Sequence, residues 1–349
     1  MRRSIAPLLV VLLLQIILAL ALLMRHDPLT GARSDTPLLQ AGLTQSADQI
    51  VIESKPAAPA AAASGSSSGA QLAPPQATHI ALKKKDGQWV LPDAYDVPAD
   101  ATRVRSLLDR LAALKRGLPI ATSESALRRF KVVDAEFERR LVLSAGGKAL
   151  GTVYFGSSPG LRKSDARTAA DRAVYAVDLP TYDLPTDLAA WIDPGLLKGD
   201  TGQLAEIDIA GAQARDAVQL IRQKGSDKQP DTWTAPSLKA DQHLDPAHAE
   251  SLAQDLAQLR IDGVLGTAAE PGWQQDHPAL QLTLKNEKSQ SVQWTLSKPG
   301  SGDFYVLKSS AHPWYLSISA SSGKRVIDGS GRDALMVSAK PEGPAPAKP

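Results

Sequence analysis

Residues 233–266, WTAPSLKADQHLDPAHAESLAQDLAQLRIDGVLG, decide the fold, because they predict the end of a strand followed by an amphipathic helix. Asp245 has a side chain of the kind that caps a helix N-terminus, and Pro246 suits the first helical turn. The apolar residues that follow recur at helical spacing and form one stripe: Ala249, Leu252, Ala253, Leu256 and Leu259. The pattern therefore predicts a helix that packs one face against a sheet.

The same pattern occurs earlier in the chain. Residues 89–118, WVLPDAYDVPADATRVRSLLDRLAALKRGL, again place a Trp before a helix, with an apolar stripe of Val104, Leu107, Leu108, Leu111 and Leu114. Two strand-like runs precede each Trp: residues 50–52 and 79–83 before Trp89, and residues 207–209 and 217–221 before Trp233. Because order, type and rough spacing agree, we predict an internal duplication.

Further strand-like runs follow each helix. They are residues 140–145, 151–155 and 173–178 in the first copy, matched in that order with 279–284, 291–296 and 303–308 in the second. Residues 157–171 are predicted to form a polar loop, and Trp191 is matched with Trp314. Leu280, Leu282 and Leu284 alternate with polar residues, which predicts a sheet with one buried face.

The expected fold class is therefore α+β. A single N-terminal transmembrane helix is followed by two tandem copies of a mixed or antiparallel sheet with packed helices. The predicted boundaries are residues 1–36 for the anchor and its flank, 37–193 and 194–338 for the two repeats, and 339–349 for a disordered tail. An Ala/Pro/Ser/Gly-rich segment, residues 55–77, is interpreted as a disordered insertion in a hairpin of the first repeat, with an interdomain linker as the alternative.

The predicted anchor is the apolar run of residues 5–24, which only Pro7 and Gln15 interrupt. About 20 residues suffice for a helix to cross a hydrocarbon core of ~30 Å. Arg2 and Arg3 precede the run and favour a cytoplasmic N-terminus. We therefore expect a single-pass membrane protein whose chain after the anchor lies outside the cytoplasm. Two alternatives are cleavage as a signal peptide near residues 19–21 and a buried core helix.

The composition limits the classes of function. The chain has 349 residues, 43% hydrophobic and 22% charged, with a net charge of +2 and no cysteine. The small net charge, with both signs interleaved, argues against nucleic acid as a partner. The absence of cysteine excludes disulfides, thiolate metal sites and cysteine nucleophiles. No Gly-rich phosphate-binding loop followed by Lys-Ser/Thr occurs, so the chain has no ATPase motif of its own.

One motif resembles a hydrolase nucleophile. Residues 156–160, GSSPG, fit G-x-S-x-G after a strand-like run and would make Ser158 the nucleophile. However, Pro159 removes the backbone N–H that an oxyanion hole uses directly after the nucleophile. The same pattern recurs at residues 65–69, inside the low-complexity segment. We therefore interpret residues 156–160 as a structural turn.

Other polar clusters have ordinary structural explanations. Four possible metal ligands lie close together, namely Asp241, His243, Asp245 and His248, but they straddle a helix start without a rigid helical pair, so we expect a capped, solvated helix end rather than a zinc or copper site. His277 and His312 precede prolines in turn-like settings. Two basic clusters are interpreted as ordinary solvated surface with Asp and Glu nearby, with a face for lipid headgroups or an acidic partner as the alternative: Arg128, Arg129, Arg139 and Arg140, and Arg162, Lys163, Arg167 and Arg172. No residue is therefore assigned a catalytic, cofactor-binding or metal-binding role.

The chain resembles the bacterial domain-of-unknown-function family 4340. The features that carry the resemblance are the anchor, the strand pair of residues 50–89 ending in DGQWVLP, the Leu-rich helix after it, and residues 294–319, WTLSKPGSGDFYVLKSSAHPWYLSIS. The 23-residue insertion departs from the compact hairpin of that family. The resemblance covers most of the chain beyond residue 36, and its motifs are structural.

The absence of a catalytic constellation, together with the resemblance, favours a non-enzymatic role, and no cofactor is expected. The anchor and the resemblance together imply a single-pass protein of the bacterial inner membrane with the bulk of its chain in the periplasm. Members of this family are often encoded beside gliding-motility-type ABC transporter permeases and ATPases. The resemblance thus implies an extracytoplasmic auxiliary subunit of an ABC-type system, anchored through residues 5–24, that binds a partner or cargo. An envelope tether that binds peptidoglycan and a cell-envelope hydrolase are the alternatives.

Overall fold

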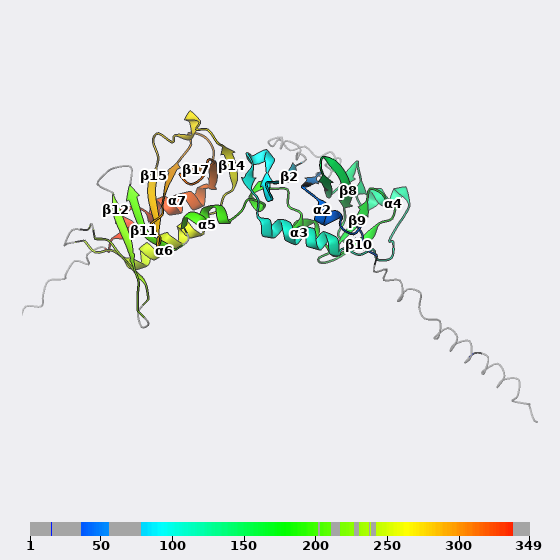
Figure 1. The fold of residues 1–349 in the computed structure, drawn as a ribbon, viewed down its shortest axis with the longest axis horizontal. Helices are drawn as coiled ribbons and strands as arrows, with labels where there is room; N and C mark the ends of the chain where they lie inside the picture. Colours follow the sequence, from blue (N-terminus) through cyan, green and yellow to red (C-terminus); the bar gives the residue numbers. More distant parts are fainter. Residues whose placement is uncertain are drawn as a thin grey trace, which may run out of the picture. The chain divides into compact units, whose positions relative to one another are not determined.

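The structure is a computed structural model that describes Gln15 and residues 36–55, 78–201, 203–210, 217–226, 230–236, 238 and 242–337. These residues form two large antiparallel sheets with packed helices, so the chain is α+β, as the sequence predicts (Figure 1). Within this described part, no helix combines the length and apolar character needed to cross a membrane. The predicted anchor apart from Gln15, the insertion beyond Lys55 and the tail lie outside the described residues.

The first sheet has eight strands. From one edge to the other they are β10 (Tyr175–Val177), β9 (Ser164–Thr168), β8 (Lys148–Phe155), β7 (Arg139–Ala145), β1 (Gln49–Ser54), β2 (Thr78–Lys85), β3 (Gln88–Leu91) and β4 (Val97–Pro98). A separate short hairpin consists of β5 (Val132–Val133) and β6 (Glu136–Phe137).

The second sheet also has eight strands. Their order is β13 (Thr232–Thr234), β12 (Val218–Gln223), β11 (Leu204–Ala210), β15 (Leu280–Asn286), β16 (Ser291–Ser297), β17 (Phe304–Ser309), β18 (Tyr315–Ser319) and β14 (Gly263–Gly266).

Seven strands follow the same order in both sheets. Counted along the chain, the order is third, second, first, fourth, fifth, sixth and seventh, if β4–β6 and β14 are set aside. Strand β4 extends one edge of the first sheet, and β14 extends the opposite edge of the second. At the place in the first sheet that corresponds to β14, Ala121 forms an isolated bridge with Val174.

The helices connect and cover these strands. The α-helices are α2 (Leu43–Ser46), α3 (Ala101–Ala113), α4 (Glu124–Arg129), α5 (Gly195–Thr201), α6 (Pro246–Ala257), α7 (Ala320–Gly329) and α8 (Arg332–Leu335). Short 3₁₀ turns are η1 (Pro92–Ala94), η2 (Thr181–Asp183), η3 (Leu188–Ala190) and η5 (Pro271–Trp273). Helices α3 and α6 occupy the same place in the strand order, after the third strand and before the fourth.

The chain divides into two compact units. Unit 1 comprises the residues up to 79 together with 105–186, and unit 2 comprises residues 80–104 together with those from 187 onward. Unit 2 thus contains the whole second sheet, strands β3 and β4, and the first turn of α3.

Helix α6 begins where its sequence predicts. Asp245 Oδ1 accepts hydrogen bonds from Ala247 N at 2.9 Å and His248 N at 3.3 Å. Four residues of the stripe are buried, namely Ala249, Leu252, Ala253 and Leu256. Leu259 lies beyond the end of the helix and is only half-buried. The helix packs against α5, α7, α8 and β13, all in unit 2.

Helix α3 begins in the same way. Asp100 Oδ1 accepts hydrogen bonds from the backbone N–H groups of Thr102 and Arg103 at 2.9 and 3.0 Å. Its buried apolar residues are Val104, Leu107 and Leu111, with Leu114 just beyond the helix. A cap followed by a stripe thus defines each helix start.

Strand alternation produces the predicted buried face. Leu280, Leu282 and Leu284 on β15 are all buried, whereas Gln281 between them is exposed. On β1, Ile50 and Ile52 are completely buried and pair with Leu143 and Leu141 of β7.

The prediction that residues 157–171 form a loop is wrong in part, because they contain β9. This strand, SDART, pairs with β8 and β10 and is buried at Ser164, Asp165, Ala166 and Thr168. Its sequence has no apolar alternation, and hydrogen bonding to two neighbouring strands satisfies its backbone instead. Ser164 Oγ donates to Leu179 O, which satisfies its hydroxyl group.

Because the sequence analysis does not predict β9, it matches the strands after β8 incorrectly with those of the second half. Residues 173–178 contain the seventh strand of the first sheet, whereas residues 303–308 contain the sixth strand of the second. Trp191 lies after β10, whereas Trp314 lies just before β18. These two Trp residues therefore do not occupy equivalent places, and both matches are corrected.

Asp165 is a buried carboxylate without compensation. Only 2% of the residue is exposed, and its Oδ1 atom has no hydrogen-bond partner among the described residues. Burial raises the pKa of this carboxyl above its ordinary value, because a low-dielectric surrounding disfavours the ionised form. The folded state therefore binds the proton more tightly than the unfolded chain, and Asp165 lowers stability increasingly as pH rises above about 4.

We expect Asp165→Asn to increase the free energy of unfolding at pH 7 by about 1–3 kcal/mol relative to its effect at pH 3, where the carboxyl is protonated in both states. Denaturant titrations at both pH values measure this difference. Asp178→Asn is the matched control, because the Asp178 side chain is 83% exposed. A gain that does not change with pH would contradict the assignment.

We expect Leu256→Ala to destabilise the protein by about 2–5 kcal/mol, because it leaves a cavity beneath α6. Leu259→Ala should cost clearly less, since this residue of the same predicted stripe lies outside the helix and is half-buried. Equal losses in urea denaturation would mean that α6 continues through Leu259.

Candidate functional site

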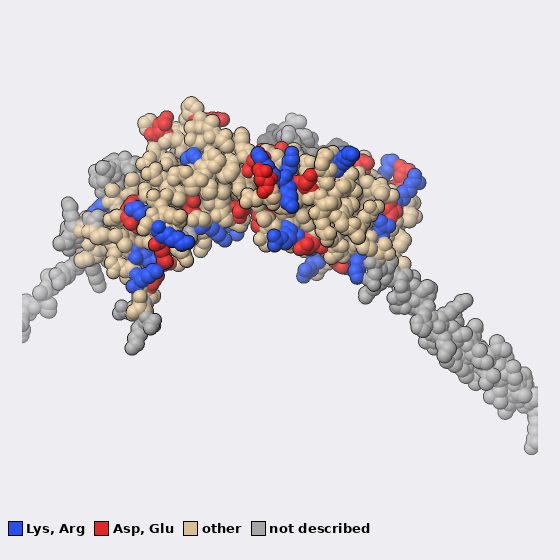
Figure 2. Space-filling view, viewed as in Figure 1, with Lys and Arg blue, Asp and Glu red and all other residues tan. Residues whose placement is uncertain are grey.

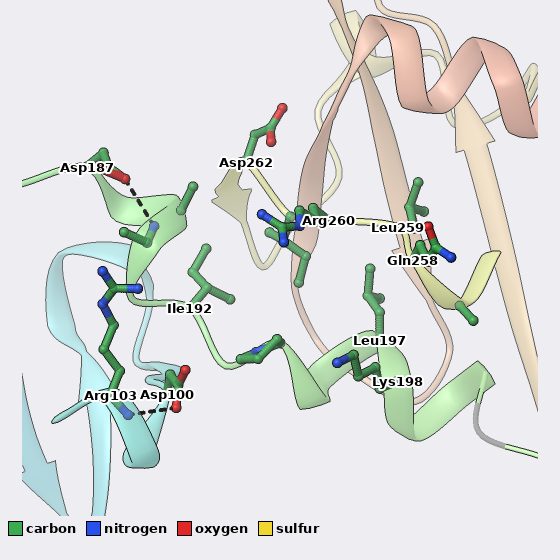
Figure 3. A pocket seen from close by; sticks show the side chains of 15 residues that line it. Asp100, Arg103, Asp187, Ile192, Leu197, Lys198, Gln258, Leu259, Arg260 and Asp262 are labelled. Carbon is green, nitrogen blue, oxygen red and sulfur yellow. Dashed lines mark hydrogen bonds between the residues drawn. The ribbon is translucent and has the colours of Figure 1, made fainter. Parts of the chain in front are cut away.

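A cavity of about 770 Å³ lies within unit 2. It is formed by the start of α3, turn η3, helix α5 and the segment that follows α6 (Figure 3). Its lining residues are Asp100, Arg103, Asp187, Ala189, Ala190, Ile192, Pro194, Leu197, Lys198, Ala257, Gln258, Leu259, Arg260, Ile261 and Asp262.

One wall is built from two capped turns. Asp100 caps α3, and Asp187 Oδ2 accepts a hydrogen bond from Ala190 N at 3.2 Å at the start of η3. The two turns are joined by a hydrogen bond from Asp100 N to Trp191 O at 2.8 Å. Trp191 is completely buried behind this wall. The wall is therefore held in place by backbone hydrogen bonds and a large apolar side chain.

The opposite wall consists of α5 and the residues after α6. The backbone N–H of Gly195 donates to Asp193 Oδ1 at 2.8 Å, and Leu197 is buried against the unit. Asp262 N donates to Ser317 O at 2.9 Å, which ties this segment to β18. Burial raises the pKa of the Asp262 carboxyl above its ordinary value.

Three cations face this cavity from different elements. Figure 3 shows Arg103 on one side and Lys198 and Arg260 on the other, with Ile192 between them and Leu197 beside Lys198. The Arg103 guanidinium carbon lies 5.3 Å from the centre of the Trp191 ring system. Among the described residues, neither Lys198 nor Arg260 has a carboxylate within 4.0 Å, whereas Asp100 and Asp187 already accept backbone hydrogen bonds.

This arrangement is suited to binding a ligand or a polypeptide segment. The lining combines aliphatic side chains with cations that have unused hydrogen-bond donors, and it contains no Ser, Thr, Cys or His. Pockets of this size with an apolar floor and a few polar groups bind ligands or polypeptide segments. A negatively charged group beside an apolar portion would match Lys198, Arg260 and the aliphatic floor.

A smaller cavity of about 410 Å³ lies in unit 1. Lys55 and Thr78, the described residues on either side of the predicted insertion, both line it. Arg140, another lining residue, forms an ion pair with Glu53 and lies over the Phe137 ring. The Arg140 side chain is thus already engaged with groups of unit 1.

Ser158 has the surroundings of a turn residue. Its hydroxyl group can donate to Gly160 O or Lys163 O, each at 2.8 Å, and both acceptors are backbone carbonyls of the same loop. A Cβ atom at Gly156 would lie 1.8 Å from Phe130 O, so close packing against the backbone explains that glycine. The glycine and serine of this G-x-S-x-G motif are therefore accounted for by the turn.

The possible metal ligands are not brought together. His248 Nδ1 lies 2.8 Å from Asp245 Oδ2, and this hydrogen bond lowers the pKa of the Asp245 carboxyl, as do the backbone donors of the cap. His243 is exposed, and Asp241 lies outside the described residues. Among the residues that the structure describes, no group of three His, Cys, Asp or Glu side chains could hold a metal ion.

Several cations of the predicted basic clusters have structural partners. Arg139 Nε donates to Leu184 O at 2.7 Å, and Arg140 pairs with Glu53. Arg167 Nε donates to Val132 O at 2.7 Å, and its guanidinium lies over the Tyr154 ring. On the visible face, Lys and Arg side chains are interspersed with Asp and Glu (Figure 2). These residues do not form one continuous basic surface there.

His312 belongs to a buried polar network that the sequence does not indicate. Asp200 Oδ2 accepts hydrogen bonds from Trp294 Nε1 at 2.8 Å and Ser309 Oγ at 2.7 Å. His312 Nε2 lies 3.0 Å from Leu196 O and 3.7 Å from Asp200 Oδ1. Since the Ser309 hydroxyl donates to the carboxylate, this network ties α5 to the sheet rather than activating a nucleophile.

Comparison with known proteins places the chain in a family without an assigned function. A family model described as "Domain of unknown function (DUF4340)" matches residues 89–283, more than half of the chain. No curated protein and no solved structure matches the chain.

We expect Lys198→Ala and Arg260→Ala each to change the free energy of unfolding by no more than about 0.5 kcal/mol, because these exposed cations have no carboxylate partner. Arg222→Ala should cost about 1–3 kcal/mol, because Arg222 donates to Glu250 Oε2 at 2.6 Å and lies over the Trp233 ring. Urea denaturation measures all three. A large loss at Lys198 or Arg260 would indicate a structural role.

Proposed function

Since the chain belongs to the DUF4340 family, whose description assigns no activity, we propose its function from the cavity and the sequence. The protein is a non-enzymatic, extracytoplasmic accessory subunit of an ABC-type transport system, anchored in the bacterial inner membrane. The observation that carries this proposal is the unit 2 cavity, in which exposed cations lie beside aliphatic side chains. Such a site holds a partner or cargo segment and does not transform it.

The membrane location is supported by sequence. Residues 5–24 are long and apolar enough to form a transmembrane helix, and Arg2 and Arg3 favour a cytoplasmic N-terminus. In this arrangement the chain from residue 37 onward lies in the periplasm. The cavity is then available to periplasmic ligands and to the periplasmic loops of a permease.

Two copies of one ancestral unit make up this periplasmic part, with residues 37–193 as the first and 194–338 as the second. The support is the shared order of seven strands and the equivalent places of α3 and α6. The aspartate cap that starts each of these helices adds to it. Duplication would explain why both halves have the same strand topology with a helix at the same place.

The proposed partners are the permease and the ATPase of a gliding-motility-type ABC transporter, as the family resemblance implies. The chain carries no phosphate-binding loop, so ATP hydrolysis is assigned to the separate ATPase. A negatively charged segment of the permease or cargo would pair with Lys198 and Arg260.

The test is a crosslinking pull-down from native membranes with the full chain tagged at its C-terminus, solubilised in mild detergent and read by mass spectrometry. We expect the permease and the ATPase among the strongest hits. The double variant Lys198→Glu/Arg260→Glu should lower their recovery by at least about tenfold, because charge reversal opposes a negatively charged segment.

Arg129→Glu/Arg162→Glu is the matched control, because it reverses two exposed cations in unit 1. Recovery of only cell-wall enzymes, or retention on purified peptidoglycan without transporter subunits, would replace the accessory role with that of an envelope tether. Undiminished recovery with the cavity variant would remove the cavity from the interface while leaving the accessory role intact.

A further inference from the structure

A short loop after α3, residues 115–120, KRGLPI, is tied to the point where the chain enters unit 1. Leu38 N donates to Leu114 O at 2.7 Å, and Arg116 N donates to Thr36 O at 2.8 Å. Pro37 and Lys115 form an isolated antiparallel bridge between the same two segments. The loop and residues 36–38 therefore form one local structure.

This loop exposes apolar side chains in a fixed conformation. Leu118 and Ile120 are 48% and 45% exposed, and Pro119 between them is also exposed. Ile120 N donates to Val174 O at 2.8 Å, which places the end of the loop beside the start of β10. A backbone hydrogen bond thus holds these apolar side chains in solvent.

The Arg116 side chain also holds the loop against the rest of unit 1. Its Nη1 atom lies 3.5 Å from Asp171 Oδ2, and its guanidinium lies over the Tyr175 ring at 5.9 Å. Asp171 has a lowered pKa, mainly because Ala173 N donates to it, although burial opposes the shift, and it remains charged for this pair. Lys115 is exposed at the start of the loop. The loop therefore combines an apolar tip with basic residues.

The chain length limits how far this loop can be from the predicted anchor. Eleven residues, 25–35, separate the apolar run from Thr36. At about 3.3–3.6 Å per residue they span at most about 40 Å when fully extended. If the span of residues 25–35 is shorter than this maximum, residues 36–38 and the loop attached to them lie correspondingly closer to the headgroup layer.

We propose that residues 115–120 are a membrane-contact loop, with Leu118 and Ile120 inserted at the boundary between headgroups and acyl chains and Lys115 near the lipid phosphates. This rests on the proposed anchor. Apolar side chains beside basic residues are the chemistry that binds anionic membrane surfaces. The contact would hold unit 1 at the membrane through a second point besides the anchor.

The test uses the absence of native cysteine, which allows one cysteine to be placed at a time. Full-length Leu118→Cys is labelled with an environment-sensitive fluorophore and reconstituted in vesicles of phosphatidylethanolamine and phosphatidylglycerol. Some of the lipids carry a nitroxide near the top of the acyl chain. Leu14→Cys, within the predicted anchor, and Leu161→Cys, on a 96% exposed residue of unit 1, are labelled in the same way.

We expect the nitroxide lipids to quench the probe at Leu118 at least about twofold more than the probe at Leu161, with a blue shift of emission only at Leu118. Replacing phosphatidylglycerol with phosphatidylcholine should weaken that quenching, because the basic residues lose their anionic partners. Quenching at Leu14 but not at Leu118 would overturn the membrane-contact loop and leave the anchor intact. Equal quenching at Leu118 and Leu161 would overturn it too, because the contact would not belong to this loop.

A deeper-placed nitroxide distinguishes failure of the anchor. If the Leu14 probe is not quenched by lipids labelled near the middle of the acyl chain, the proposed membrane anchoring itself is wrong, and the loop proposal falls with it. In native membranes containing the transporter, protection of Leu118→Cys from quenching, combined with a crosslink to the permease, would assign the loop to a protein partner instead of lipid.

Discussion

Each sheet depends on the pairing of its first strand with a strand far along the chain. Gln49 pairs with Ser144 in the first sheet, and Leu204 pairs with Asn286 in the second. The chain between such partners first adds its hairpin strands to one edge of the sheet. It then crosses back through a helix before the partner strand begins. These non-local pairs form only after a long loop has closed. The apolar faces of α3 and α6 provide the burial that compensates for this closure.

That constraint also creates the candidate site. The start of α3, the segment after β10 and the end of α6 all lie where the chain changes direction next to a sheet. In unit 2 these three ends meet around one cavity, and each contributes a charged side chain. Helix and turn starts require capping carboxylates, which explains Asp100 and Asp187. The cations of the cavity lining do not cap a helix or a turn, and their exposure is consistent with a role in recognition.

Two carboxylates in unit 2 are well supplied with hydrogen-bond donors, whereas the buried Asp165 in unit 1 has an oxygen atom without a partner. Asp200 receives two hydrogen bonds, and Glu250 receives donors from Trp233 and Arg222 that outweigh the effect of burial and lower its pKa. Asp165 on β9 lacks comparable partners. A buried carboxylate whose partners are few is a local weakness, and a neutral side chain of the same shape would relieve it. Strand β9 of unit 1 therefore carries a carboxyl group whose burial raises its pKa.

Local patterns in the sequence determined much of this protein. The caps and stripes of α3 and α6, the buried alternation of β15, the α+β class and the family are all legible from single residues and their spacing. The sequence is also the sole basis for the predicted anchor, because residues 5–24 apart from Gln15 lie outside the described part. Tertiary structure alone decided that SDART is a strand, because pairing on both sides overrides its polar composition. It also decided that Arg103, Lys198 and Arg260 share a cavity, since residues so far apart in the chain have no periodicity or motif that links them before the chain folds.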